Sequence, residues 1–304
     1  MLVNARPFSV LPALVALLAG SMAGCGLTGG AGGENGGRVE VVAAENFWGN
    51  IAGELGGSHV NLTSIVANPA TDPHAYEATP ADARTVASAR YFILNGAGYD
   101  PWAPRLVAAN PVPGRTVLSV ADLVGRREGD NPHLWYSPDY VYRFVDRVTA
   151  DLKAIDPADA ADFDTLHTRY RTQALRHYSD LVTTIRSRYS GVRVGATESI
   201  FVYMSQATGL QLITPPEFMK AVSEGTDPSA TDRVITEQQV AQKQVRVLVF
   251  NAQNTTPDVN ALVDRARGEG LPVVGVTETL APAGATFQDW QSAQLNAVLR
   301  ALGG

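Results

Sequence analysis

The sequence predicts an α/β protein built as two βα lobes with parallel-rich sheets, joined by one long spine helix. Short apolar runs alternate with helix-like segments in both halves of the chain, which is typical of mostly parallel sheets covered by helices. Between the halves, residues 158–189 carry apolar side chains at spacings of three and four, the pattern of an amphipathic helix. At 1.5 Å per residue this helix would run on the order of 45 Å, too long for a simple crossover between strands.

Residues 1–24 are typical of a secretory signal peptide. Arg6 precedes an apolar run over 8–18, and small residues follow before Cys25, the single cysteine. The run is shorter than the roughly 20 apolar residues that a membrane-spanning helix needs. The segment ending at Cys25 resembles a bacterial lipobox, whose cysteine carries lipid chains that would anchor the mature protein to the membrane. The alternative is an incidental thiol. Residues 25–37 would then be the lipidated cysteine and a flexible glycine-rich tether.

Residues 38–156 form the predicted N-terminal lobe. Apolar runs predict strands over 39–44, 60–66 and 91–94, and a short helix over 51–55. Thr79 and Pro80 indicate a helix start, because threonine caps a first turn well and proline suits its first position. Ser137 and Pro138 give the same signal for a helix that continues to residue 155. The segment 95–102 lacks a complete nucleotide-binding fingerprint, so we interpret it as a turn before another helix.

The joining helix occupies residues 157–190, and residues 191–304 form the predicted C-terminal lobe. The domain boundary falls along that helix. The expected elements of the C-terminal lobe are strands over 192–197, 210–213, 245–250 and 273–277, and helices over 199–208, from 227 onward, over 257–268 and over 287–302.

Composition excludes several classes of protein. The 304 residues carry a net charge of −6 with acids and bases interspersed, which argues against a nucleic-acid partner. No motif recurs at a fixed period, so a solenoid or propeller is not expected. Because there is one cysteine, the exported domain must be stable without internal disulfides. We also expect a monomer.

Four side chains stand where an α/β sheet collects ligands, beyond the carboxyl ends of strands or in a neighbouring loop. His74 and His133 each follow a proline, and a proline favours extended backbone in the residue before it. Glu198 and Glu278 each follow a predicted strand of the C-terminal lobe. Two imidazoles and two carboxylates suit a divalent transition metal. The alternative is that the histidines are ordinary loop residues and the acids are solvated.

Several motifs distributed along the whole mature chain resemble those of the zinc/manganese-binding lipoproteins of ABC transporters. They are Ala43-Ala44-Glu45-Asn46-Phe47, Asp72-Pro73-His74-Ala75-Tyr76-Glu77, Asn131-Pro132-His133-Leu134-Trp135, the segment from Thr197 to Tyr203, and Glu224-Gly225-Thr226-Asp227-Pro228. The resemblance implies that His74, His133, Glu198 and Glu278 are the metal ligands. Two departures are notable: Glu278 stands where the family commonly has aspartate, and the histidine-rich loop of many zinc-specific members is absent. Glu198 matches the manganese-associated pattern of the family.

The resemblance implies an extracytoplasmic, lipid-anchored solute-binding protein. It would capture Zn²⁺ or Mn²⁺ between two lobes and deliver the ion to a membrane permease, without being an enzyme. The alternative is an exported metalloenzyme, such as a hydrolase, that uses the same histidines and glutamates. Four protein ligands would leave little room for the catalytic water that such an enzyme requires. A third hypothesis is a binding protein for an organic solute, with incidental histidines.

Overall fold

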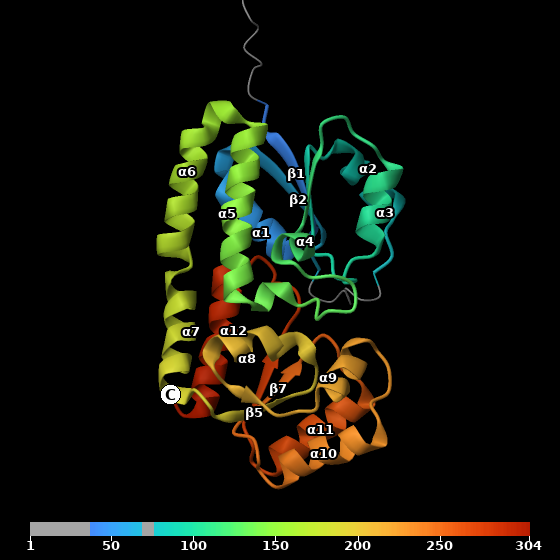
Figure 1. Cartoon of the computed structure of the whole chain (residues 1–304), viewed down its shortest axis with the longest axis vertical. Helices are drawn as coiled ribbons and strands as arrows, with labels where there is room; N and C mark the ends of the chain where they lie inside the picture. Colours follow the sequence, from blue (N-terminus) through green and yellow to red (C-terminus); the bar gives the residue numbers. More distant parts are fainter. Residues whose placement is uncertain (1–36, 69–75) are drawn as a thin grey trace, which may run out of the picture. The chain divides into compact units, whose positions relative to one another are not determined.

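The computed structural model describes residues 37–68 and 76–304. Two four-stranded sheets, both entirely parallel, organise this part of the chain, with helices packed against them (Figure 1). The predicted α/β fold class is therefore confirmed. In the first sheet, whose order is β2-β1-β3-β4, the strands are β1 Val39–Glu45, β2 Val60–Val66, β3 Tyr91–Leu94 and β4 Thr116–Ser119. In the second, whose order is β6-β5-β7-β8, they are β5 Arg193–Ala196, β6 Gln211–Leu212, β7 Leu248–Asn251 and β8 Val273–Val276.

Strand β4 is the one strand that the sequence analysis did not predict. It is a short edge strand in which only Leu118 is buried and Val117 is 42% exposed, so it lacks a continuous apolar run. The central strand β3 is buried along its whole length, as its four apolar residues predict.

Two of the five helices in the first half of the chain begin where the capping residues predict. The helices of this half are α1 Asn46–Gly56, α2 Pro80–Ser88, α3 Trp102–Ala109, α4 Val120–Val124 and α5 Pro138–Ile155. The Thr79 side chain accepts a hydrogen bond from the backbone of Asp82, and the Asp82 carboxylate accepts one from the Thr79 backbone, which completes a capping box. Ser137 caps α5 by accepting from Tyr140. Helix α1 is longer than expected because it begins directly after β1.

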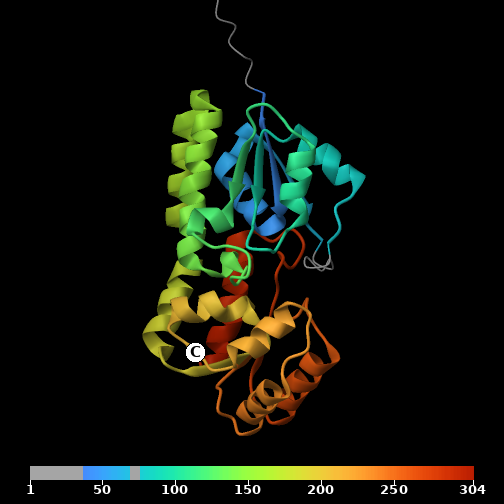
Figure 2. The same cartoon turned by 45° about the vertical axis from the view of Figure 1, so that its right-hand side comes forward.

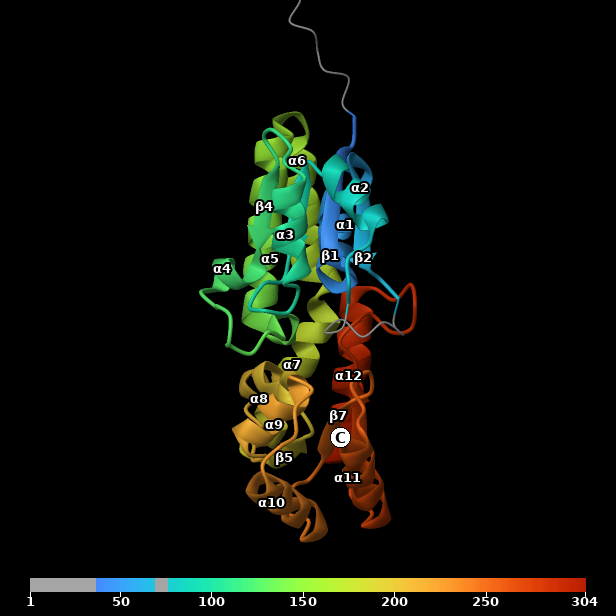
Figure 3. The same cartoon turned by 90° about the vertical axis from the view of Figure 1, so that its right-hand side faces the viewer.

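Between the two sheets, the single helix expected over 158–189 is interrupted by a π-helical turn. A 3₁₀ turn, Pro157–Asp159, leads into α6 Ala160–Arg169, then a π-helical turn Tyr170–Ala174, then α7 Arg176–Tyr189 (Figures 2 and 3). The Leu175 backbone donates to the Tyr170 carbonyl, five residues back. Residues five apart on an α-helix point about 140° apart, so the wider turn lets Tyr170 and Leu175 both be buried.

The remaining helices pack on the second sheet. They are α8 Val202–Thr208, α9 Pro216–Ser223, α10 Ala230–Ala241, α11 Pro257–Gly268 and α12 Phe287–Leu302. Helix α9 was not predicted. Helix α10 begins later than expected because Ser229, rather than Asp227, caps its first turn by accepting from Asp232. Helices α11 and α12 have the predicted bounds.

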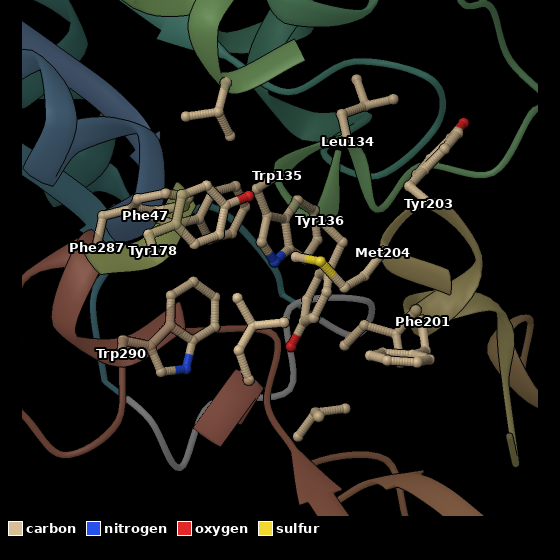
Figure 4. Close-up of a cluster of buried hydrophobic side chains, with 14 of the residues drawn as sticks. Phe47, Leu134, Trp135, Tyr136, Tyr178, Phe201, Tyr203, Met204, Phe287 and Trp290 are labelled. Atoms are coloured by element: carbon tan, nitrogen blue, oxygen red, sulfur yellow. The ribbon is translucent and has the colours of Figure 1, made fainter. Parts of the chain in front are cut away.

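One continuous apolar core joins the two sheets through aromatic side chains (Figure 4). Phe47 of α1 stacks on Trp135 with ring centroids 4.0 Å apart, and Tyr136 meets Trp290 of α12 edge to face. Burial of this kind stabilises a fold by about 25 cal/mol per Å² of apolar surface removed from water. The short 3₁₀ turn η3, Leu134–Tyr136, is therefore fixed by packing from both halves of the chain.

Three predictions fall on residues outside the described part of the chain. These are the signal peptide over 1–24, the lipidated Cys25 with most of its tether, and His74. Within residues 37–68 and 76–304, no helix combines the length and the apolar character needed to span a bilayer.

Candidate metal site

Three of the four predicted ligand side chains lie together in the structure. His133 directly precedes η3, Glu198 follows β5 after one residue, and Glu278 follows β8 after one residue. One ligand atom from each lies within 4.8 Å of the other two, and the Nε2 of His133 is 3.7 Å from the Oε1 of Glu198. All three are buried, with exposed fractions of 0%, 0% and 1%. The loop of one half and two strand ends of the other thus converge on one point.

The two carboxylates are held by hydrogen-bond donors that the sequence analysis did not identify. The Nδ2 of Asn251, the last residue of β7, donates to the Oε1 of Glu198 at 2.9 Å and the Oε1 of Glu278 at 2.6 Å. Asn254 Nδ2 donates to the Oε2 of Glu198 at 2.8 Å. The phenol of Tyr99 donates to the Oε2 of Glu278 at 2.8 Å. Every oxygen of the pair therefore accepts a hydrogen bond.

His133 is oriented by an amide. Its Nδ1 lies 2.8 Å from the Oδ1 of Asn131, and that oxygen also accepts from the backbone of His133. Because an amide oxygen only accepts, Nδ1 carries the proton and Nε2 presents its lone pair toward Glu198. The Asn131 side chain also donates to the Ser199 carbonyl at 2.8 Å, which ties the histidine loop to the segment that follows Glu198. A fixed tautomer of this kind is typical of metal-binding histidines.

The charge of the site suits a dication. Two buried carboxylates beside a neutral imidazole would be strongly unfavourable on their own, because desolvation of each charge is costly. A divalent cation would balance the two negative charges, and imidazole nitrogen with carboxylate oxygen is a donor set that Zn²⁺ and Mn²⁺ accept.

A second layer of titratable groups supports the first. Burial, and then the neighbouring Asp100, hold the pKa of Glu45 well above its usual value. Burial also raises the pKa of Asp100, whose carboxylate accepts from the backbone of Asn95 at 2.7 Å and of Gly96 at 2.8 Å. Burial and the negative charge of Glu278 hold the pKa of Tyr99 well above its usual value. Tyr99 is therefore a protonated donor to Glu278.

Of the donors that the sequence analysis missed, Asn251 could have been predicted from a sequence pattern, whereas Tyr99 could not. Asn251 ends a strand, so the rule that selected Glu198 and Glu278 could have selected it as well. Tyr99 lies in the segment correctly interpreted as a turn, where Gly96, Ala97 and Gly98 all have positive φ. Nothing local to that turn predicts that its tyrosine reaches Glu278, 179 residues further on.

A cavity of about 750 Å³ lies next to the site. Its lining includes Asn131, Ser199 and Asn254, each of which contacts His133 or Glu198. The side chains of Glu128 and Glu217 also line it. Solvent thus reaches the outer layer of the site from an acidic cavity.

A second group of potential ligands lies elsewhere, where the turn after α1 meets the start of α6. His59 contacts Asp159 through Nδ1 at 2.6 Å and Asp162 through Nε2 at 3.1 Å. Its ring packs edge to face on the buried Phe163. Each ring nitrogen contacts a different carboxylate, and both acids are more than a third exposed, so this cluster links the turn after α1 to the start of α6.

Comparison with known proteins places the chain in context. The profile of the family described as ZnuA, zinc-uptake complex component A, periplasmic, matches residues 41–301. A manganese-binding lipoprotein, MntA, of Halalkalibacterium halodurans is 28% identical over 235 residues, covering 75% of each chain. PsaA of Streptococcus pneumoniae, named a manganese ABC transporter substrate-binding lipoprotein, is 24% identical over 198 residues, covering 58% of this chain and 61% of the relative.

Solved structures show the same fold. The Mn-bound form of a periplasmic metal-binding protein from Candidatus Liberibacter asiaticus superposes with a TM-score of 0.73. It is 17% identical in sequence, and the match covers 87% of this chain and 100% of that one.

Proposed function

We propose that this chain is the solute-binding protein of a metal ABC transporter, because it belongs to the ZnuA family of periplasmic zinc-uptake components. It captures Zn²⁺ or Mn²⁺ outside the cytoplasm and delivers the ion to a membrane permease. The family membership that the sequence motifs predicted is confirmed by the profile match. The relatives described above carry the names of binding proteins, one of them explicitly a component of an ABC transporter.

The observation that carries the proposal is the convergence of His133, Glu198 and Glu278 at one buried point. In the proposed site these three residues and His74 are the metal ligands. The proposed organisation has an N-terminal lobe over 38–156, a linker over 157–190 and a C-terminal lobe over 191–304. The ion then lies between the lobes, and its release requires ligands from one lobe to withdraw, which contact with the permease would bring about.

Metal content tests the proposal directly. The purified protein should retain one ion per chain after it is equilibrated with Zn²⁺ or Mn²⁺ and desalted. Inductively coupled plasma mass spectrometry measures this metal content. His133→Ala should lose it. His59→Ala is the matched control, because it removes a half-buried histidine that contacts two carboxylates at the other cluster. Retention of the ion by His133→Ala and its loss from His59→Ala would contradict the proposed site.

Activity assays address the alternative of a metalloenzyme. The zinc-loaded protein should not hydrolyse ester, phosphoester or peptide substrates. Hydrolysis that disappears in both His133→Ala and Glu198→Gln would favour the enzyme over the binding protein.

The export route is also part of the proposal. The chain is secreted through residues 1–24, lipidated at Cys25, anchored to the membrane and monomeric. Incorporation of labelled fatty acid into the wild-type protein, and its absence in Cys25→Ser with release of that variant from the membrane fraction, would support this. Equal membrane retention of both proteins would argue against the anchor.

A further inference from the structure

We infer that Tyr136 and Gln294 form a clamp that holds the loop of His133 against the backbone that carries Glu278, so that both side chains are positioned before an ion arrives. The inference rests on the proposed function and concerns residues outside the proposed ligand set. It assigns a positioning role to one side chain from each half of the chain.

The clamp acts on Thr277, the residue between the end of β8 and Glu278. The register of β8 with its neighbour ends at Val276. Beyond that point, side chains hold the backbone of Thr277. Its N–H donates to the Oε1 of Gln294 at 2.8 Å, and its carbonyl accepts from the phenol of Tyr136 at 2.8 Å. The residue that precedes Glu278 is therefore fixed through both of its backbone polar groups.

The same two side chains connect Thr277 to the histidine loop. Tyr136 is the last residue of η3 and lies three residues after His133. Its hydroxyl also lies 2.9 Å from the Oε1 of Gln294, so its single hydrogen is shared between that oxygen and the Thr277 carbonyl. One amide oxygen of α12 thus meets both the histidine loop and the end of β8.

Packing keeps the clamp in place. Tyr136 is 1% exposed and Gln294 is 9% exposed, so water competes little for their hydrogen bonds. The ring of Tyr136 packs edge to face on Trp290, which lies one turn before Gln294 on α12. The indole of Trp290 donates to the Oγ1 of Thr277 at 2.7 Å. Helix α12 therefore holds both the backbone and the side chain of Thr277.

The clamp connects groups that strand pairing alone does not hold together. His133 lies in a loop of the first half of the chain, outside both sheets, whereas Glu278 follows a strand of the second half. Their ligand atoms nevertheless lie within 4.8 Å of each other. Metal sites depend on supporting contacts that hold the ligands near their binding geometry. Loss of the clamp should let these two ligands separate and release the ion faster.

The test compares Zn²⁺ binding by the parent, Tyr136→Phe and Gln294→Met. Phenylalanine keeps the ring without the hydroxyl, and methionine keeps the length of the side chain without the amide. Competition with a chelator gives Kd, and mixing the loaded protein with excess chelator gives the dissociation rate. We expect each substitution to raise both by about tenfold, since loss of an outer contact typically changes metal affinity by roughly 10–100-fold. The double variant should bind as the weaker single variant does, and additive losses would overturn the clamp.

Tyr91→Phe is the matched control. It also removes a buried phenol, which donates to the carboxylate of Asp151 at 2.8 Å, but in the first sheet and away from the site. Urea denaturation should show a loss of stability in this variant as well, yet its Kd for Zn²⁺ should equal that of the parent. A parental Kd in both Tyr136→Phe and Gln294→Met would overturn the inference, while metal lost in His133→Ala would still support the proposed function. A parent protein that binds no metal would overturn both.

Discussion

Glu45 shows how a single residue near the site affects stability. It ends β1, is 1% exposed, and faces Asp100, so burial and a neighbouring acid both favour its protonated form. In the unfolded chain the same carboxyl would ionise at its ordinary pKa. Glu45 therefore does not destabilise the folded state at low pH. The free energy of unfolding decreases as the pH rises from the pKa of this carboxyl in the unfolded chain toward its higher pKa in the folded chain.

Glu45→Gln should remove this penalty. Glutamine can still donate a hydrogen bond to Asp100 but has no proton to lose, so the variant should be more stable than the parent at pH 8. The difference should shrink toward pH 4, where the parent carboxyl is largely protonated in both states. Urea denaturation of the metal-free proteins at pH 4, 6 and 8 measures it. A variant that is less stable than the parent at every pH would contradict the protonated state of Glu45.

The residues of the site differ in whether the sequence predicts their positions. The positions of Glu198 and Glu278 followed from strand ends, because parallel strands bring their carboxyl ends to one edge of a sheet. Asn251 obeys the same rule and could have been found. Tyr99 could not, because its partner lies across the fold and its orientation depends on packing against Trp135 and Phe47. Strand ends thus predict where carboxylates gather, whereas the tyrosine that orients one of them is determined by long-range packing.

Between elements, the triad of His59, Asp159 and Asp162 joins the turn after α1 to the start of α6. Both acids lie at a helix N-terminus, where the helix dipole already favours negative charge. Partly exposed ion pairs contribute modestly, because water and salt screen them.

His59→Ala should therefore lower the free energy of unfolding by about 1 kcal/mol, from the loss of two partly exposed contacts with carboxylates and of packing on Phe163. Chemical denaturation of the two proteins would measure the loss. Phe163→Ala should cost about 3–5 kcal/mol because its ring is fully buried. If His59→Ala leaves the free energy of unfolding unchanged, then the contacts of His59 do not stabilise the fold.

The elements that the sequence predicted best are those with clear caps or long apolar patterns. Helices α11 and α12 and the start of α5 followed from such signals. Strand β4 and the π-turn did not, for different physical reasons. A half-exposed edge strand has no apolar run, and a helix with apolar residues at 170, 174 and 178 gives the same spacing with or without one wider turn. The structure distinguishes the two by the hydrogen bond from Leu175 to the Tyr170 carbonyl and by the burial of Leu175.

At the scale of the whole molecule, one core connects the two sheets. The same cluster of buried residues contains Ile93 of the first sheet, Val249 of the second, and Trp135 between them. Domains that share a continuous core unfold together, whereas lobes joined only by a linker would unfold separately. The proposed metal site lies along this junction, since Tyr99, from the first half of the chain, donates to Glu278 in the second.

Calorimetry of the metal-free protein should accordingly show one unfolding transition. Zn²⁺ binds only the folded state strongly, so at a free concentration roughly 100-fold above Kd it should add about 2.7 kcal/mol of stability. For a chain of this size that corresponds to a rise in Tm of roughly 5 °C. His133→Ala should show the single transition without the rise, while Tyr91→Phe should show both. If instead two transitions appear, and Zn²⁺ shifts only the one assigned to the C-terminal half, then the ion is held by that half alone and the shared core does not couple the lobes.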